Sequence, residues 1–484
     1  MVKKMNKYNE VKHILGDKLK NFLQKPEYVF ILLAGLFGII MIFLMPFFMA
    51  PDEVAHLHRA YQVSNGGIVS ESNKTITGGV IPIELDLSIK DYTRTIESND
   101  HHSQLFSNSR YFTNKLNMSD QKLVDFSSAA IYSPVAYIPQ AIGIKVAQVV
   151  YPSLGVMMVL GRLANLAVYI LLICIAVRIA KNGKWVYVVV GLFPVAIQQA
   201  ASLSTDVMTM GLVFIWVALI SNMYLQKNSI SKKQWITILI IAIGLALTKQ
   251  TNIVLLTPLL FIPGRIFKDN LHKFKFVLSV FGASALALVA WFIIMQLNHY
   301  NLQISKDTLV SQAGQTSFLL QHPLSFILTL WHTYFSVALS DFYIASMHSM
   351  FSLLSYRLSL SLTIIGYVGL LLAFMYDDNV GGEKRSNKFV TRLAIVQATT
   401  YAISAVAIAG ALYLAWTPVG LNQVLGIQGR YFLPLIPLLI PIFVLVRNKV
   451  KMTTDKPYIM GILVVVTSGI NLLAMLAVTY RWFY

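Results

Sequence analysis

The segment that follows the first long apolar run, "PDEVAHLHRAYQVSNGG", carries two acids, two histidines and an arginine within eight residues. A carboxylate within about 3 Å of a hydroxyl group can take its proton, which typically accelerates a reaction 10² to 10⁴-fold. Asp52 and Glu53 are therefore candidates for a general base. His56 and Arg59 could orient that base or bind an anionic or hydroxylated substrate. This chemistry suits the transfer of a group onto a hydroxyl.

The same segment has the signals of a short helix. Pro51 suits the first helical position, the two acids suit the positive end of the helix dipole, and Gly66 marks the stop. At 100° per residue, Asp52, His56 and Arg59 fall within about 60° of one another. Glu53 and the second histidine point elsewhere. The alternative is a solvated helix with a local ion pair.

Three further ionisable residues lie at the ends of apolar runs, namely Asp206, Lys249 and Arg430. An ionisable group costs up to about 3 kcal/mol as it nears the bilayer centre, so each needs a partner, a route to the interface or a function. The two cations could bind and stabilise an anionic group, and the acid could bind hydroxyl groups. Gln428 and Tyr431 flank the arginine and are assigned with it to substrate binding. Helix capping for the acid and snorkelling for the cations are the alternatives.

No cofactor is expected. His56, His58, His101 and His102 could bind a divalent metal together with Asp52, but no recognised metal motif supports this alternative. The single cysteine lies inside an apolar run, so no disulfide can form within the chain.

Composition places the chain among integral membrane proteins. Hydrophobic residues make up 56% of it and charged residues 12%. The net charge of +18 arises from Lys and Arg in short segments between apolar runs, which is typical of cytoplasmic loops and does not indicate nucleic acid binding. An all-α, polytopic bundle is predicted.

Alternation of these basic loops predicts about eleven crossings, with the N-terminus inside and the C-terminus outside. A basic amphipathic helix is expected over 1–27, on the inner leaflet. The first crossing leads to a long outer loop, and 131–150 is interpreted as a re-entrant or interfacial helix. The crossings are expected near 28–49, 155–179, 185–201, 203–225, 235–248, 250–267, 275–297, 356–376, 391–415, 430–447 and 458–480.

Five segments, in this order, resemble an uncharacterised bacterial family of polytopic membrane proteins, a domain of unknown function that is similar to the GT-C glycosyltransferase superfamily. They are "PDEVAHLHRAYQVSNGG", "YSPVAYIPQAIG", "STDVMTMGL", "TKQTN" and "IQGRYFLPLIPL", and the resemblance covers roughly 28–445. In GT-C enzymes an acid of the first outer loop, often written DE, is the catalytic base, and a polyprenyl-phosphate sugar is the donor. The position that matches this acid is Asp52, with Glu53 beside it.

The resemblance implies a glycosyltransferase of the bacterial plasma membrane that uses a cell-envelope glycan or lipid as acceptor on the extracytoplasmic face. The chain is accordingly predicted to contain a cytoplasmic helix (1–27), a GT-C-like module (28–300) with its outer loop at 50–130, an interfacial segment (301–355) and C-terminal transmembrane helices (356–484). Two alternatives remain: a flippase or transporter of lipid-linked sugars, and an envelope polysaccharide polymerase or ligase that acts on diphosphate-linked oligosaccharides.

Overall fold

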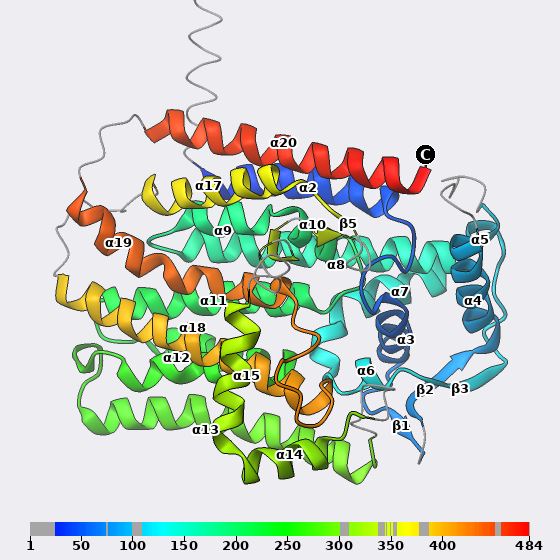
Figure 1. The fold of residues 1–484 in the computed structure, drawn as a ribbon, viewed down its shortest axis with the longest axis horizontal. Helices are drawn as coiled ribbons and strands as arrows, with labels where there is room; N and C mark the ends of the chain where they lie inside the picture. The colour runs from blue at the N-terminus through cyan, green and yellow to red at the C-terminus, as the bar shows by residue number, and fades with distance from the viewer. Residues whose placement is uncertain are drawn as a thin grey trace, which may run out of the picture.

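A computed structural model describes most of the chain as helix (Figure 1). Nearly all of the amphipathic helix predicted over 1–27 lies outside the described residues, as do His101 and His102. The described residues are 25–73, 76–98, 109–300, 309–336, 344, 346–348, 350–351, 356–376, 387–450 and 456–483.

Seven helical segments in the described part of the chain are long and apolar enough to cross a membrane. They run side by side along the horizontal direction of Figure 1. These segments establish a multi-pass, mainly helical membrane protein. They are formed by α2 (Pro26–Leu44), α8 (Leu154–Ile179), α11 (Asp206–Leu225), α13 (Asn270–Leu297), α18 (Asn387–Ala415), η4 (Gly429–Leu439) with α19 (Ile440–Lys449), and α20 (Lys456–Phe483).

Shorter apolar elements run alongside these helices. One of them, η2, is a 3₁₀ segment that contains Pro258. The long segment η4 is also a 3₁₀ helix and contains Pro434 and Pro437. Proline removes the N–H that a regular α-helix would use. Pro194 likewise separates the predicted 185–201 crossing into two helices. The shorter elements are α9 (Lys184–Gly191), α10 (Pro194–Ala200), α12 (Lys232–Thr248), η2 (Gln250–Phe261), η3 (Gly264–Ile266) and α17 (Leu360–Tyr376).

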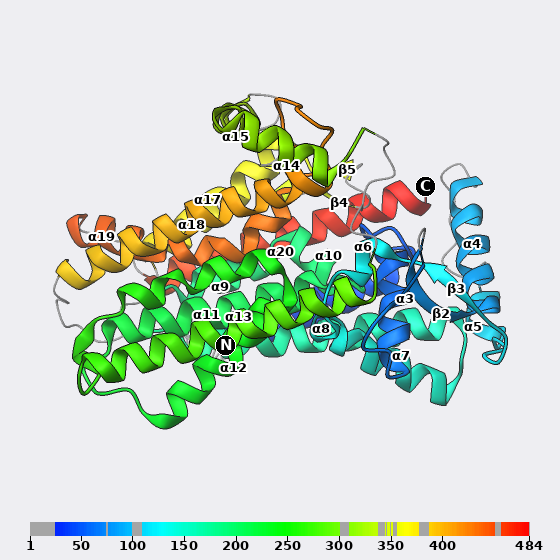
Figure 2. The ribbon, with the colours of Figure 1, turned by 90° about the horizontal axis from the view of Figure 1, so that it is seen from below.

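A compact cap of short elements occupies the right-hand end of the bundle in Figures 1 and 2. It contains a three-stranded antiparallel sheet in the order β1-β2-β3, in which Gly78 of β2 pairs with both Glu71 and Asp125. The sheet was not anticipated from the sequence. The elements are α3 (Glu53–Ser64), β1 (Glu71–Ser72), β2 (Thr77–Pro82), α4 (Ile83–Ser98), α5 (Arg110–Thr113), β3 (Gln121–Asp125), α6 (Ser127–Ala130), η1 (Pro134–Tyr137) and α7 (Ile138–Val150).

Two helices stand out from the bundle at the top of Figure 2, α14 (Gln312–Gln321) and α15 (Pro323–Phe335). α15 crosses α18. The hydroxyl of Tyr334 in α15 donates a hydrogen bond to the carbonyl oxygen of Ala405 in α18 (2.8 Å). The described residues of the segment predicted as interfacial thus include these two short helices. A hairpin of two strands with two residues each, β4 (Met350–Phe351) and β5 (Tyr356–Arg357), precedes α17.

α11 is the central helix of the bundle. Its apolar side chains belong to both large hydrophobic clusters, one built around α2, α8 and α9 and the other around α12, η2 and α18. α13, by contrast, exposes most of its apolar side chains, as expected of a helix that faces lipid. Asp206 is the residue that begins α11.

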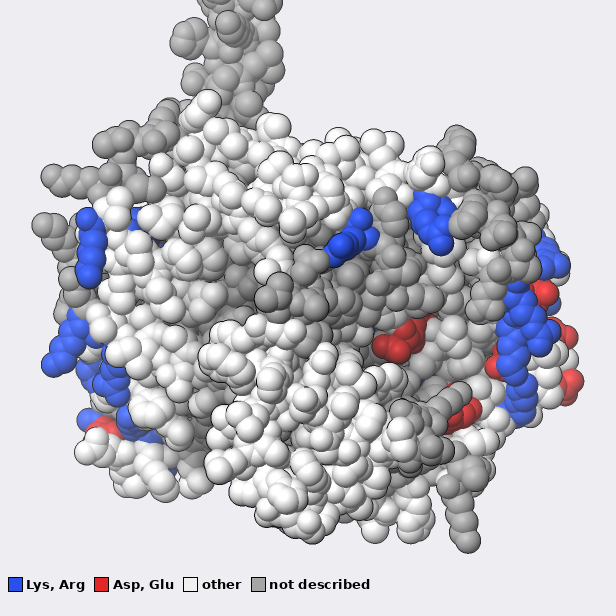
Figure 3. Space-filling model, in the orientation of Figure 1, with Lys and Arg blue, Asp and Glu red and all other residues white. Residues whose placement is uncertain are grey.

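Charged side chains gather at the two ends of the bundle. In Figure 3, Lys and Arg line the left edge, both signs of charge occur at the right end, and the left and central part of the face between them is nearly free of charge. α7 has 13 residues and is about 20 Å long, too short to cross a bilayer core of about 30 Å. This length agrees with the interpretation of 131–150 as a segment that does not span.

Candidate functional site

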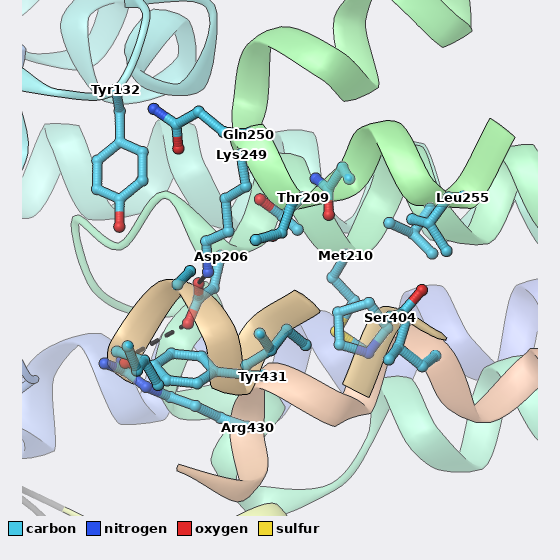
Figure 4. Close-up of a pocket in the computed structure, with 18 of the residues that line it drawn as sticks. Tyr132, Asp206, Thr209, Met210, Lys249, Gln250, Leu255, Ser404, Arg430 and Tyr431 are labelled. Carbon is cyan, nitrogen blue, oxygen red and sulfur yellow. Dashed lines mark hydrogen bonds and ion pairs between the residues drawn. The ribbon is translucent and has the colours of Figure 1, made fainter. Parts of the chain in front are cut away.

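Three charged side chains converge at one end of α11, as Figure 4 shows for Asp206, Lys249 and Arg430. Lys249 Nζ donates to Asp206 Oδ1 at 2.7 Å, and Arg430 Nη1 lies 3.6 Å from Asp206 Oδ2. Each comes from a different part of the chain: the start of α11, the junction of α12 with η2, and the first turn of η4. One carboxylate thus holds two cations that are 181 positions apart in sequence (430 minus 249).

Arg430 is the most extensively coordinated of the three. Its Nη1 donates to Oε1 of Gln199 at 3.1 Å, and its Nη2 lies 3.7 Å from Asp52 Oδ2. The ring of Tyr431 lies 5.3 Å from the guanidinium and 5.0 Å from the Lys249 ammonium, distances at which an aromatic face attracts a cation. The arginine therefore links Asp52 to the other charged residues.

Asp52 stands at the mouth of this cluster. It immediately precedes α3 and has a left-handed backbone with φ of 62°. Its side chain is 59% exposed, compared with 19% for Asp206. An acid that is both exposed and close to a buried guanidinium is accessible to a substrate. The predicted helix start was wrong by two residues, because α3 begins at Glu53 and not at Pro51.

His56 lies on the first turn of α3 behind Asp52. Its Nδ1 is 2.9 Å from the hydroxyl of Tyr137, which comes from η1. Burial lowers the pKa of the His56 imidazole below its ordinary value, although the negative charge of Asp52 acts in the opposite direction. A neutral imidazole fixed by a tyrosine hydroxyl is suited to hydrogen bonding with a substrate or with the neighbouring acid.

Two predicted site residues face away from the cluster. Glu53 is buried and forms a two-pronged ion pair with Arg162 of α8, with contacts of 2.9 and 2.8 Å. Arg59 is buried and donates to Gln62 and to the carbonyl oxygens of Gly67 and Ile68. The single helical face proposed for Asp52, His56 and Arg59 does not exist, because Asp52 lies outside the helix and the arginine serves the turn after it.

Gln428 directly precedes η4 and does not line the cavity described below. Its carbonyl oxygen accepts from the backbone N–H of Tyr431 at 3.1 Å. Its side-chain Oε1 is buried and has no hydrogen-bond partner among the described residues. The structure therefore places it beside the site, where it supports the turn that carries Arg430.

A cavity of about 330 Å³ extends from the charged cluster into the bundle. Its polar end includes Tyr132, Gln199 and Gln250 beside the three charged residues, as Figure 4 shows in part. The rest is mainly apolar and is lined by α11, η2, α18 and η4, with Met210, Val213, Leu255, Ile408, Leu412 and Leu435 among its residues. A cavity with a charged end and an apolar interior fits an amphiphile with an anionic head.

Sequence reasoning did not identify Gln199 or the role of Gln250. Gln199 holds Arg430, and Nε2 of Gln250 donates to the carbonyl oxygen of Ile131 at 3.2 Å. The available signal was the pair of glutamines in the apolar stretch "PVAIQQA". No group of three or more possible metal ligands occurs among the described residues.

The chain belongs to the family described as Predicted membrane protein (DUF2142), whose profile matches residues 34–439. That range contains the charged cluster, the cavity and α3. No curated protein and no solved structure matches the chain.

Proposed function

We propose that this family member is a GT-C-like glycosyltransferase that transfers a sugar from a polyprenyl-phosphate donor to a cell-envelope glycan or lipid. The observation that carries the proposal is the cavity whose charged end meets an exposed acid. Lys249 and Arg430 could bind the donor phosphate, the apolar interior could take the first part of the lipid chain, and the exposed Asp52 lies beside Arg430.

The charges of the cavity favour a monophosphate donor over a diphosphate. Among its lining residues two are cations and one is an acid, which leaves a net charge of +1; Asp52, which is largely exposed beside Arg430, lies outside this lining and is not counted. A sugar phosphodiester carries one negative charge, and a diphosphate linkage carries two. Because uncompensated charge in a water-poor cavity is costly, the single net positive charge matches the phosphodiester better. This supports the transferase over a polymerase or ligase with diphosphate substrates.

In the proposed reaction, the acceptor hydroxyl oxygen forms a bond to the anomeric carbon of the sugar. The bond from that carbon to the phosphate oxygen breaks, and its electron pair leaves with polyprenyl phosphate. The hydroxyl proton passes to Asp52. Arg430 and Lys249 stabilise the negative charge that grows on the phosphate, with the arginine able to grip two oxygens at once.

The proposed topology counts α9 with α10, α12, η2 with η3, and α17 as crossings in addition to the seven long segments, which makes about eleven. The basic connections then face the cytoplasm of a bacterium, and the cap with the charged cluster faces outward. A donor that has already been flipped to the outer leaflet would reach the cavity from the lipid phase.

Purified protein incubated with a panel of polyprenyl-phosphate sugars tests the proposal. Mass spectrometry should detect sugar-dependent release of polyprenyl phosphate in the presence of an envelope extract as acceptor. Release of a lipid diphosphate would favour the polymerase or ligase. Movement of a labelled lipid-linked sugar across vesicles without cleavage would favour the flippase.

A further inference from the structure

Behind the charged cluster, α8 presents two polar side chains that are completely buried in the bundle. They are Arg162 and Asn165, which are three positions apart and so lie on the same face of the helix. Each contacts a backbone turn that leads into one of the acids of the site. Neither lines the cavity.

Arg162 holds the turn that connects α2 to α3. Its Nη1 donates to the carbonyl oxygens of Ile42 (3.1 Å) and Met45 (2.9 Å), and its Nη2 donates to that of Pro46 (3.1 Å). The remaining donors of the guanidinium engage both oxygens of Glu53. This turn ends at Asp52.

Glu53 joins that turn to a second one. Its Oε2 accepts from the backbone N–H of Phe48 at 2.8 Å, and its Oε1 accepts from the N–H of Leu203 at 3.1 Å. Phe48 lies four positions before Asp52, and Leu203 lies three positions before Asp206. One buried carboxylate thus ties together the two turns that carry the acids.

Asn165 holds the second turn from the other side. Its Nδ2 donates to the carbonyl oxygens of Ser202 (2.7 Å) and Ser204 (3.0 Å). Gln140 of α7 donates to the same carbonyl of Ser204, also at 3.0 Å. The hydroxyl of Ser204 in turn accepts from the N–H of Asp206 at 3.2 Å.

We propose that Arg162, Glu53 and Asn165 are positioning residues, which hold Asp52 and Asp206 on either side of the Arg430 guanidinium. Both Phe48 and Asp52 have left-handed backbones, an unfavourable conformation that persists only where the surroundings impose it. A buried ion pair adds little net stability compared with apolar residues, so a role in fixing conformation accounts better for this one. The geometry stands by itself, and only its catalytic consequence rests on the proposed function.

The test measures the spacing of the two acids directly. In a Cys174→Ser background, the substitutions Asp52→Cys and Asp206→Cys introduce one thiol at each position. A short bis-maleimide joins the two thiols, and mass spectrometry follows the rate of cross-linking. Glu53→Leu combined with Arg162→Met removes the network without leaving a buried charge. We expect it to slow cross-linking about tenfold or more below the melting temperature.

A matched pair of single variants provides the control. Asn165 and Asn471 are both fully buried, and each donates from Nδ2 to two carbonyl oxygens. Asn165→Leu and Asn471→Leu should lower the melting temperature to a similar degree, but only Asn165→Leu should slow cross-linking. If the double variant does not fold, the comparison of Asn165→Leu with Asn471→Leu still tests whether the network sets the spacing of the two acids.

The proposal is overturned if the network variants are less stable but cross-link at the rate of the parent protein. Cross-linking does not depend on sugar transfer, so an inactive protein would refute the proposed function and leave this result intact. If the transferase is active, Asn165→Leu in the chain with both acids restored should lower kcat more than it raises KM for the donor.

Discussion

At the scale of single residues, Asp52 and Glu53 are neighbours in sequence with opposite surroundings. Asp52 is largely exposed and lies beside Arg430, whereas Glu53 has no exposure and is saturated by Arg162 and two backbone N–H groups. Only the exposed acid could reach a hydroxyl of the proposed acceptor. The two acids therefore call for different experiments.

Asp52→Asn should lower turnover by about 10² or more, because the amide cannot take a proton. Asparagine tolerates the left-handed backbone that position 52 adopts, so folding should be unchanged. Sugar transfer and melting temperature at matched expression are the measurements. Asp91→Asn on the exposed surface of α4 is the control and should remain fully active. Full activity of Asp52→Asn would remove it from the role of base.

Glu53→Gln should lower the stability of the protein, whereas Asp52→Asn should lower its turnover. The glutamine leaves the buried Arg162 without its counter-charge, which typically destabilises a protein by about 3–5 kcal/mol. We expect a large drop in melting temperature, with activity lost in proportion to the folded fraction. A stable but inactive Glu53→Gln would instead identify Glu53 as a group that takes part in the chemistry.

Arg430→Lys keeps the charge but loses the planar fork that reaches Gln199, Asp206 and Asp52 at once. We expect about tenfold or more lower kcat/KM for the donor, measured as release of polyprenyl phosphate. Arg178→Lys in the last turn of α8 is the control, and its kcat/KM for the donor should equal that of the parent protein. Equal donor use by Arg430→Lys would mean that the arginine serves only the interface or the local ion pairs.

Sequence alone identified the charged residues of the cluster because ionisable groups at the ends of apolar runs are rare and costly. It did not identify their partners. The contact between Asp52 and Arg430 spans 378 positions (430 minus 52), and nothing local in either segment specifies it. Arg162 was visible as a charge inside an apolar run, but its partner could be named only once α8 was packed against the turn before α3.

At the scale of elements, α3 shows where helical periodicity stops being a guide. Its end was predicted correctly, since the helix stops at Ser64 and Gly66 has φ of 83°. Its start was not, because Asp52 adopts a left-handed turn. The angular rule applies only inside a helix, so it misplaced Asp52 relative to Arg59.

α3 also carries a second histidine with a testable property, which lies near Asp86 of α4. His58 is buried, neither ring nitrogen has a hydrogen-bond partner among the described residues, and its Nε2 lies 3.8 Å from Asp86. Asp86 is already paired with Lys90 at 2.8 Å and Lys122 at 2.6 Å. Burial lowers the pKa of His58 to about 4 despite the nearby acid, and the charges of the two lysines act in the same direction. The same lysines hold the pKa of Asp86 below its ordinary value, although burial acts to raise it.

The protein should therefore lose stability as the pH falls from about 6.5 to about 4. The unfolded chain binds a proton at His58 in this range and the folded protein does not, so acid favours unfolding by up to a few kcal/mol. His58→Phe should make this part of the pH profile shallower, as measured by thermal melting in detergent, while the lowered pKa of His56 still contributes. Asp86 contributes only at lower pH, since its pKa is lowered from 3.8. An equally steep profile in His58→Phe would contradict the assignment.

At the scale of the whole molecule, every segment predicted to cross the membrane corresponds to a helical element, although several begin later or are broken by proline. Long apolar runs are governed by the thickness of the bilayer, which is why they can be found without a structure. The small sheet of the cap could not, because strands of two to six residues give little periodic signal and take their register from distant partners.

The orientation of the bundle decides whether the charged cluster meets the extracytoplasmic or the cytoplasmic leaflet. The cap sheet carries the exposed Glu71, and the first turn of α12 carries the exposed Lys233. They lie at opposite ends of α12, because Lys249 of the charged cluster directly follows its last residue, Thr248, and Ser133 of the cap donates to the carbonyl oxygen of Leu247 at 2.7 Å. In a Cys174→Ser background, Glu71→Cys should react with a membrane-impermeant maleimide in intact bacterial cells. Lys233→Cys should react only after the cells are opened. The reverse pattern would place Asp52 and Arg430 in the cytoplasm, where a donor on the outer leaflet could not reach them, and the proposed function would fail with it.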